Sequence, residues 1–137
     1  MSAFVTKTIL VALSLLLVAS DYNSNATKVR VKNNLDEGKT LTLSCTYNAA
    51  NNTKSAPVDG VLQSNQIKEF SFNSIATPSI DCTFKWKDTS HLFPIYVDYR
   101  DNPYCLTECT WSIKPDRPCR VDPNYSEIIY YCDTWIK

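Results

Sequence analysis

Hydrophobic and polar side chains alternate along most of the chain after residue 27, with the period of two that is typical of β-strands lying between a core and solvent. The clearest case is the segment 40–47, in which Leu41, Leu43, Cys45 and Tyr47 alternate with threonine and serine. The same pattern, in longer or shorter form, occurs at 28–32, 67–72, 80–86, 93–99, 111–113 and 125–132. It predicts seven or eight short strands, and no helical periodicity follows the amino-terminal region.

Short segments of small and polar residues separate these strands, at 33–38, 48–55, 73–78 and 87–90. A single sheet of this many strands would leave one apolar face in water, so the pattern predicts an all-β fold, a small antiparallel β-sandwich of seven to eight strands. The chain has only two glycines, Gly38 and Gly60. We therefore expect several asparagines to occupy turn positions with positive φ.

The first 20 residues have the layout of a secretory signal peptide. One basic residue, Lys7, precedes an almost unbroken apolar run at 8–18, and the small residues Ala19 and Ser20 follow it. This run of about a dozen residues is shorter than the roughly 20 that a membrane-spanning helix needs, which argues against an uncleaved anchor. We expect residues 1–20 to be removed and residues 21–137 to form a single secreted, extracellular domain without membrane insertion.

All six cysteines lie after the signal peptide, and an even number in an exported chain predicts three disulfides. They are Cys45, Cys82, Cys105, Cys109, Cys119 and Cys132, and the sequence leaves their pairing open. Four of them fall in the last third of the chain, so we expect this end to be stapled to upstream strands and the sheets to be cross-linked. A zinc site is the weaker alternative, because Cys105 and Cys109 form the only close pair and His91 is the only histidine. We expect no metal or other cofactor.

Three sequons for N-linked sugar begin at Asn25, Asn51 and Asn124. In an exported chain each of them marks a surface position. Asn51 lies in the most polar loop and is the strongest candidate, and we expect one or two of the three to carry sugar.

Charge is balanced, with 14 basic and 14 acidic residues over the whole chain. A partner bound mainly through its phosphates needs a basic face, so we expect no nucleic acid partner. The one local cluster of positive charge, Lys114, Arg117 and Arg120, is interrupted by acidic residues. We interpret it as a solvated loop, with a small anion site as the alternative.

Catalytic chemistry finds little support in the sequence. A ribonuclease mechanism with two histidines as acid and base is excluded as usually built, because the chain has one histidine. His91 stands near Asp88 and Ser90, but this spacing is that of a turn and supplies no triad geometry. The even cysteine count argues against a free thiol nucleophile. Paired carboxylates of a glycosidase stay open without any feature in their favour, the candidates being Glu69, Glu108 and Glu127. We expect the protein not to be an enzyme.

Six spaced blocks carry a resemblance to a known family. They are Val31-Lys32-Asn33-Asn34-Leu35, Leu41-Thr42-Leu43-Ser44-Cys45, Cys82-Thr83-Phe84-Lys85-Trp86, Phe93-Pro94-Ile95-Tyr96-Val97-Asp98, Cys109-Thr110-Trp111-Ser112-Ile113 through Pro118-Cys119, and Cys132-Asp133-Thr134-Trp135. In this order they resemble the plant self-incompatibility S-protein family, which includes the poppy stigma S-proteins. The resemblance implies a small, secreted, disulfide-bonded β-sandwich that acts as a ligand. In poppy, a pollen membrane protein recognises the stigma proteins, which trigger calcium influx and rejection of self pollen.

The resemblance therefore predicts a secreted signalling ligand, a monomer, that binds a cell-surface membrane receptor through exposed loops. We expect the loops at 48–58 and 98–104 to form the contact surface. The candidate contact residues are Asn48, Asn52, Lys54, Asp98, Arg100 and Asp101. The alternative is a secreted defence or carbohydrate-binding protein on the same scaffold, with exposed tyrosines and tryptophans such as Trp135 as stacking platforms.

Overall fold

The computed structural model of the chain describes residues 26–105 and 107–136. The predicted signal peptide at 1–20 and the sequon asparagine Asn25 lie outside these residues. Within the described part, no helix has the length and apolar character needed to cross a membrane.

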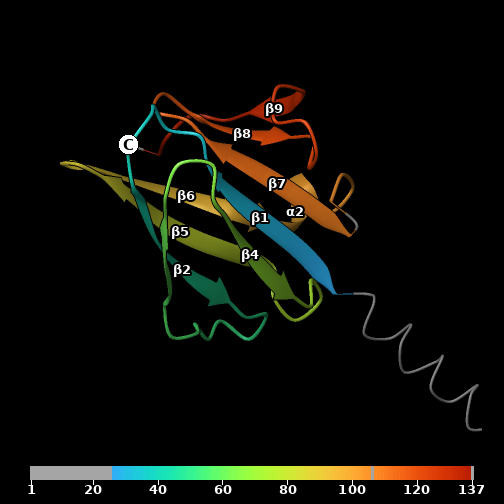
Figure 1. Ribbon diagram of the computed structural model, residues 1–137. Helices are drawn as coiled ribbons and strands as arrows, with labels where there is room; N and C mark the ends of the chain where they lie inside the picture. Colours follow the sequence, from blue (N-terminus) through green and yellow to red (C-terminus); the bar gives the residue numbers. More distant parts are fainter. Residues whose placement is uncertain (1–25, 106, 137) are drawn as a thin grey trace, which may run out of the picture.

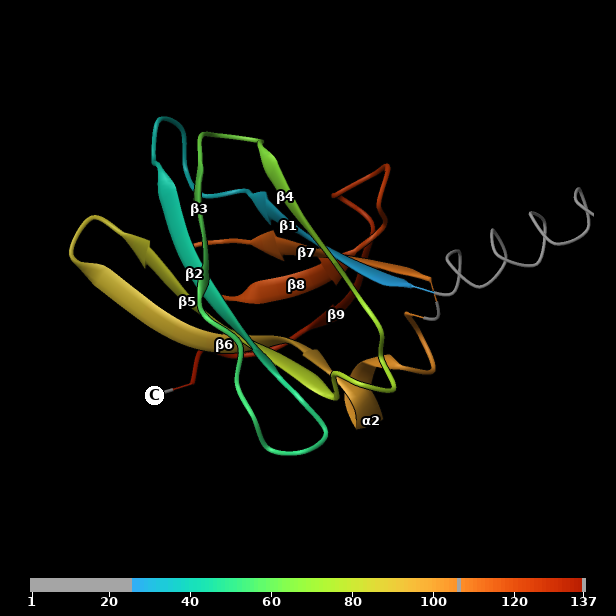
Figure 2. The same ribbon diagram turned by 90° about the horizontal axis from the view of Figure 1, so that it is seen from below.

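The described residues form two stacked β-sheets, as the alternating pattern predicts (Figures 1 and 2). The elements are β1 (Thr27–Asn33), β2 (Leu41–Asn48), β3 (Val58–Leu62), β4 (Ile67–Phe72), β5 (Ser79–Trp86), β6 (Thr89–Val97), α2 (Asp98–Asp101), β7 (Glu108–Ile113), β8 (Pro118–Val121) and β9 (Ile129–Cys132). The five-stranded sheet has the order β4-β1-β7-β8-β9, and the four-stranded sheet has the order β3-β2-β5-β6. The all-β prediction is confirmed, with β3 and β8 as additional strands.

One strand pair departs from the antiparallel prediction. β1 and β7 run parallel, with Val31 beside Trp111, whereas the other pairs in both sheets are antiparallel. β1 thus lies inside the five-stranded sheet, next to the edge strand β4 and beside the central strand β7. Strands far apart in the sequence therefore hold the centre of this sheet together.

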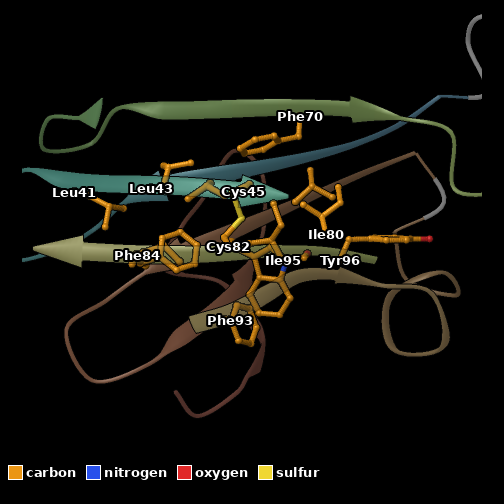
Figure 3. Close-up of a cluster of buried hydrophobic side chains, with 14 of the residues drawn as sticks. Leu41, Leu43, Cys45, Phe70, Ile80, Cys82, Phe84, Phe93, Ile95 and Tyr96 are labelled. Atoms are coloured by element: carbon orange, nitrogen blue, oxygen red, sulfur yellow. A yellow bond between two sulfur atoms is a disulfide. The ribbon is translucent and has the colours of Figure 1, made fainter. Parts of the chain in front are cut away.

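The core lies between the two sheets and consists of the side chains that alternate inward. The five-stranded sheet contributes Val29, Val31, Phe70, Trp111 and Ile113, and the four-stranded sheet contributes Leu41, Leu43, Ile80, Phe84, Phe93 and Ile95. Figure 3 shows several of these side chains packed around the Cys45–Cys82 disulfide. The indole Nε1 of Trp111 also donates a hydrogen bond to the carbonyl oxygen of Ile95 at 2.7 Å, which ties the two sheets at a buried point.

A β-bulge changes the side-chain alternation late in β6. The register with β5 shifts between Ile80 and Asp81, so that Ile95 and Tyr96 are both buried although they are adjacent. The strand ends at Val97, and the chain enters the short helix α2. The prediction that Tyr99 continues the inward row of a strand is therefore wrong, and Tyr99 is exposed instead.

All six cysteines are paired, as Cys45–Cys82, Cys105–Cys109 and Cys119–Cys132. The first pair joins β2 to β5 within the four-stranded sheet, and the last joins β8 to β9 within the five-stranded sheet. The middle pair closes the short segment before β7. The prediction of three disulfides is confirmed. However, the expectations that they cross-link the sheets and staple the last third of the chain to upstream strands are wrong.

Asparagines replace glycine in the turns, as predicted from the low glycine content. Asn52 and Asn65 both have φ of 67°, in the left-handed region that Asn tolerates better than most residues. Asn33 has a different role at the end of β1, where its fully buried amide Nδ2 donates to the carbonyl oxygens of Lys39 and Leu62, each at 2.9 Å. One side chain thus satisfies a buried carbonyl group and a half-buried one in neighbouring segments.

Candidate functional site

Both loops that the sequence singles out as receptor contacts lie at the same end of the sandwich. The registers place the ends of β2, β4, β6 and β8 there, together with the beginnings of β1, β5 and β7. The segments 49–57, 73–78, 98–105 and 122–128 connect these strands, and we call them together the loop end. Figure 2 shows the β2–β3 connection and α2 on the same side of the molecule.

Backbone hydrogen bonds join three of these segments into one surface. The amide of Ala50 donates to the carbonyl oxygen of Ala76 at 3.0 Å, and the amide of Asp98 donates to that of Pro78 at 2.9 Å. The side-chain amide of Asn48 donates to Ser79 Oγ at 2.9 Å and to Asp81 Oδ2 at 2.8 Å. The 73–78 segment, which the sequence indicated only as a strand breaker, therefore lies between the two predicted contact loops.

The candidate contact residues differ in exposure. Asn52 and Lys54 are exposed, and Asn48 and Asp98 are half-buried. Asp98 accepts hydrogen bonds from the Tyr96 hydroxyl at 3.2 Å and from Asn102 Nδ2 at 2.8 Å. Asn52 and Lys54 are thus available to a partner as they stand, whereas Asn48 and Asp98 also serve the loop structure.

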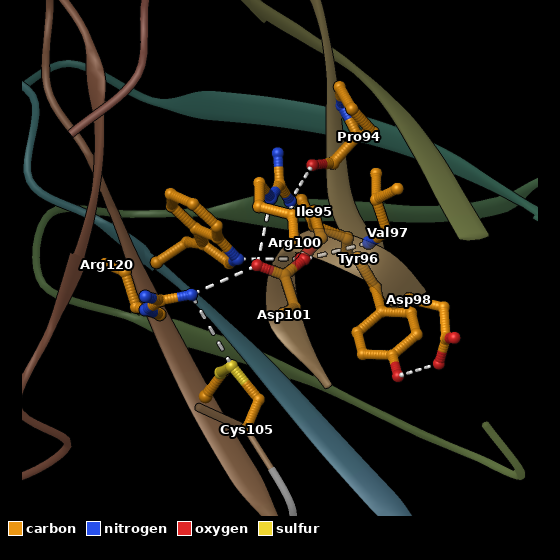
Figure 4. The surroundings of a disulfide bond; sticks show 11 residues. Pro94, Ile95, Tyr96, Val97, Asp98, Arg100, Asp101, Cys105 and Arg120 are labelled. Carbon is orange, nitrogen blue, oxygen red and sulfur yellow. Dashed lines mark hydrogen bonds and ion pairs between the residues drawn. A yellow bond between two sulfur atoms is a disulfide. The ribbon is translucent and has the colours of Figure 1, made fainter. Parts of the chain in front are cut away.

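Asp101 and Arg100 correct the sequence prediction, because Asp101 is buried, Arg100 is half-buried, and both are tied up in supporting the loop (Figure 4). Asp101 is 0% exposed, and its carboxylate accepts from the Val97 amide at 2.8 Å, from Arg100 Nε and Nη2 at 2.9 and 2.7 Å, and from Arg120 Nη1 at 3.1 Å. The Arg100 guanidinium carbon also lies 5.0 Å from the ring centre of Phe93. A buried carboxylate with these partners holds the 98–105 segment against β8 and leaves no group for a receptor.

Arg120 also departs from its predicted place in a solvated loop. It belongs to β8 and is buried, because its guanidinium pairs with Asp101 and lies 4.9 Å from the ring centre of Tyr104 and 5.5 Å from that of Tyr131. The basic cluster of the sequence is therefore split, since Arg117 stays exposed.

Tyr96 stands at the base of the loop end. Burial, and next the negative charge of Asp98 and the hydrogen bond to it, raise the pKa of the Tyr96 phenol to about 12. The ring also packs edge-on against Phe72, with ring centres 4.7 Å apart. Tyr96 therefore connects the core to the half-buried Asp98 of α2.

Three large side chains at the loop end are mostly exposed to solvent. Ile75 and Tyr99 are each 87% exposed, and Tyr104 is 73% exposed. Single exposed hydrophobic residues are ordinary, but these three occur on neighbouring segments of one end of the molecule. Sequence analysis missed Ile75, and it placed Tyr99 both at the end of the 93–99 strand and in the 98–104 contact loop, because α2 is not visible as a periodic pattern.

A pocket of about 630 Å³ opens beside the 98–105 segment. Its walls include the side chains of Tyr104, Tyr130 and Tyr131, and its polar lining includes Glu108, Thr110 and Arg120. Glu108 Oε1 lies 2.6 Å from Arg30 Nη1, and Arg30 also pairs with Glu69 at 3.3 Å. Because a guanidinium lies between the carboxylates of Glu69 and Glu108, they do not form the open acid–base pair of a glycosidase.

Trp135, the predicted stacking platform, packs partly buried against the core. Its ring lies 4.6 Å from that of His91, nearly parallel, and 5.8 Å from that of Trp86. Burial lowers the pKa of His91, so the imidazole is neutral at physiological pH. The structure thus shows His91 in an aromatic cluster rather than in a triad, and no group of three or more His, Cys, Asp or Glu side chains in the described ranges could hold a metal ion.

Two of the predicted sequons lie at the loop end. Asn51 is exposed, and its Oδ1 accepts a hydrogen bond from Thr53 Oγ1 at 2.6 Å. Asn124 is exposed beside Pro123, which lines the pocket. Sugar attached at either position would therefore extend from the same end as the contact loops.

Comparison with known proteins agrees with this architecture. The family model for plant self-incompatibility protein S1 matches residues 28–135, which is nearly the whole described chain. The chain belongs to this family. S-protein homolog 3 of Arabidopsis thaliana is 30% identical over 122 residues, covering 81% of this chain and 76% of the relative. S-protein homolog 29 of the same plant is 29% identical over 115 residues, covering 83% and 82%.

Higher identity is confined to a shorter stretch of this S-protein family member. S-protein homolog 19 of Arabidopsis thaliana is 45% identical over 40 residues, which is 29% of this chain and 30% of that relative. The chain spans about a third of the length of S-protein homologs 19, 5 and 2, which it matches over 40 to 60 residues. The comparisons show the family and a self-incompatibility-type protein, and they agree with the resemblance of the six sequence blocks.

Proposed function

We propose that this protein is a secreted signalling ligand of the self-incompatibility type, which acts in cell–cell recognition by binding a cell-surface membrane receptor through its loop end. The observation that supports this most is the convergence of the 49–57, 73–78 and 98–105 segments on one surface. A scaffold of two sheets presents these loops in fixed relative positions, as rigid folds commonly do for binding loops.

The exposed anchors of this surface are Ile75 and Tyr99. Tyrosine is enriched among residues that dominate binding energy, because it buries a large rigid ring at low entropic cost. Asn52 and Lys54 add polar groups at the rim. We propose that these four residues form the contact surface. Arg100 and Asp101 hold the 98–105 segment in position beneath it.

The proposed receptor binding is tested with labelled, oxidised protein and membrane fractions of the producing plant. We expect saturable binding, and we expect Tyr99→Ala and Ile75→Ser to weaken it by at least about tenfold each. Val61→Ser is the matched control, because Val61 is 62% exposed on β3, away from the loop end. Equal binding by all three variants would remove the loop end as the contact surface.

Secretion is the second part of the proposal. We propose cleavage after Ser20, a monomeric secreted product, and sugar at Asn51. Mass spectrometry of the product from culture medium tests the cleavage and the sugar, with Asp21 expected as the first residue and a sugar mass that disappears in Asn51→Gln, and light scattering of the same product tests the monomer. A product that retains residues 1–20 and stays with the cell would contradict it.

A further inference from the structure

The pocket next to the loop end contains polar groups that the fold does not use. Thr110 is buried, and among the described residues its Oγ1 has no hydrogen-bond partner. Glu108 Oε1 is also buried, but the Arg30 guanidinium lies 2.6 Å from it and neutralises it, so Glu108 can offer only its second carboxylate oxygen to a ligand. Both residues line the pocket. Buried polar atoms in native proteins nearly always have partners, so the Thr110 hydroxyl indicates a bound group that supplies one.

Arg120 adds donors to the same lining. Its Nη1 donates to Asp101 and lies near the Cys105 sulfur, whereas its Nε and Nη2 donate to none of the residues that the structure describes. The pocket therefore offers donors at Arg120, an acceptor at Glu108 and a group of both kinds at Thr110.

The apolar part of the pocket is aromatic. Tyr104, Tyr130 and Tyr131 border it and are 73%, 60% and 38% exposed, so part of each ring is accessible to a ligand although Arg120 lies over one face of the Tyr104 and Tyr131 rings. The hydroxyl groups of Tyr130 and Tyr131 donate to Asp122 and Asp133, at 2.7 and 3.1 Å, which restrains both rings. Restrained, exposed aromatic rings are flat platforms for the C–H face of a ligand.

The charges of the pocket balance one another. Arg100 and Arg120 share the carboxylate of Asp101, Asp133 lies 3.8 Å from Arg100, and Glu108 faces Arg30. This balance disfavours a charged ligand, and a mixed set of donors and acceptors beside flat rings fits molecules whose hydroxyl groups both donate and accept. A volume of about 630 Å³ is also within the usual range of sites for small ligands.

We propose that this pocket binds a short, uncharged carbohydrate segment. The sugar hydroxyl groups hydrogen-bond with Glu108, Thr110 and Arg120, and the sugar rings stack on the tyrosines. The proposal goes beyond the receptor role and does not depend on it, because Tyr99 and Ile75 do not line the pocket.

The test uses the full secreted chain carrying Asn124→Gln, so that sugar attached at the neighbouring sequon does not compete. The probes are neutral hexasaccharides of β-1,4-linked glucose, mannose and xylose, a released oligomannose N-glycan, and an oligogalacturonide of six units as the acidic counterpart. Titration calorimetry is expected to give a Kd tighter than about 1 mM for at least one neutral probe, and weaker binding of the acidic one. Binding of a hexasaccharide would indicate that the natural ligand belongs to the plant matrix. Binding of the N-glycan would indicate that it belongs to a glycoprotein.

Two variants locate the binding. Tyr104→Ala removes a platform and Thr110→Val removes the unpartnered hydroxyl, and each is expected to weaken binding about threefold to tenfold. Thr110→Val is also expected to keep the thermal midpoint or raise it, which separates lost binding from lost folding. Tyr99→Ala is the matched control and is expected to bind as the parent does.

Three results would overturn the proposal. They are no binding of any neutral probe, binding of the acidic probe as tight as that of the best neutral one, and equal effects of Tyr104→Ala and Tyr99→Ala. If the pocket binds no sugar, the receptor proposal still stands, because it is tested by binding of Tyr99→Ala to membrane fractions.

Discussion

Replacement of Asp101 by asparagine should destabilise the fold strongly, although the two side chains have nearly the same shape. The carboxylate is fully buried and neutralises Arg100 and Arg120, whose side chains are only 14% and 9% exposed. Asparagine leaves both guanidinium groups without their shared counter-charge and places an NH₂ group among donors. Breaking a buried ion pair on one side typically costs about 3 to 5 kcal/mol, which corresponds to a thermal midpoint lowered by about 10 to 20 °C for a domain of this size.

Urea unfolding at pH 7 with the disulfides intact measures this loss. Tryptophan fluorescence reports the transition, because Trp111 lies against Arg100. The matched control is Asp116→Asn, since Asp116 is also paired with an arginine, Arg117 at 3.6 Å, but its side chain is 71% exposed. The control should lose less than about 1 kcal/mol. If Asp101→Asn loses no more than the control, Asp101 does not hold the loop end, and its assignment as a receptor contact becomes open again.

Three further predictions follow from the interior. Replacing Cys45 and Cys82 together by alanine removes a bond that closes a loop of sequence separation 37 and should lower the free energy of unfolding by about 4 kcal/mol, measured against the oxidised parent. Because the folded-state pKa of Tyr96 is raised to about 12 from a usual value near 10, the stability that the protonated phenol contributes is present below pH 10 and is lost between pH 10 and 12. Urea midpoints should therefore fall in this window less for Tyr96→Phe than for the parent, and parallel curves would contradict the reasoning. Asn33→Ala leaves one buried and one half-buried carbonyl group unpaired and should cost about 2 to 4 kcal/mol, whereas a loss below about 1 kcal/mol would show that water replaces the amide.

The sequence predicts the strands whose side-chain alternation is long and unbroken. β2 and β5 each show four inward hydrophobic or cysteine positions in a row, and both appear where the pattern places them. β3 is different, because its sequence Val58-Asp59-Gly60-Val61-Leu62 is short, contains glycine and lies at an edge of the sheet. Such a strand is held by its neighbour β2 rather than by its own periodicity.

β8 escaped prediction because of its charge. A buried arginine in a short segment looks like a solvated loop unless its partner is known, and the partner of Arg120 is Asp101, 19 residues away in the sequence. The bulge between Ile80 and Asp81 is equally invisible, since it depends on how two strands pair. The same long-range dependence explains why the predicted site residues Arg100 and Asp101 turned out to be interior. The tyrosine-lined pocket likewise combines residues from α2, β7, β8 and β9 and their connections.

The absence of a disulfide between the sheets in the described chain changes how the loop end must be held. The three bonds act within sheets or within one short segment, so the sheets are joined by packing of the core and by contacts such as that of Trp111 with Ile95. The 98–105 segment is fixed at two points, by the carboxylate of Asp101 and by the Cys105–Cys109 bond next to β7. Tyr99 therefore lies exposed directly before Arg100 and Asp101, the two residues that anchor its backbone. The proposed contact residue Tyr99 and its structural support thus share four positions of one short helix, which is why substitutions at adjacent residues of α2 should separate binding from folding.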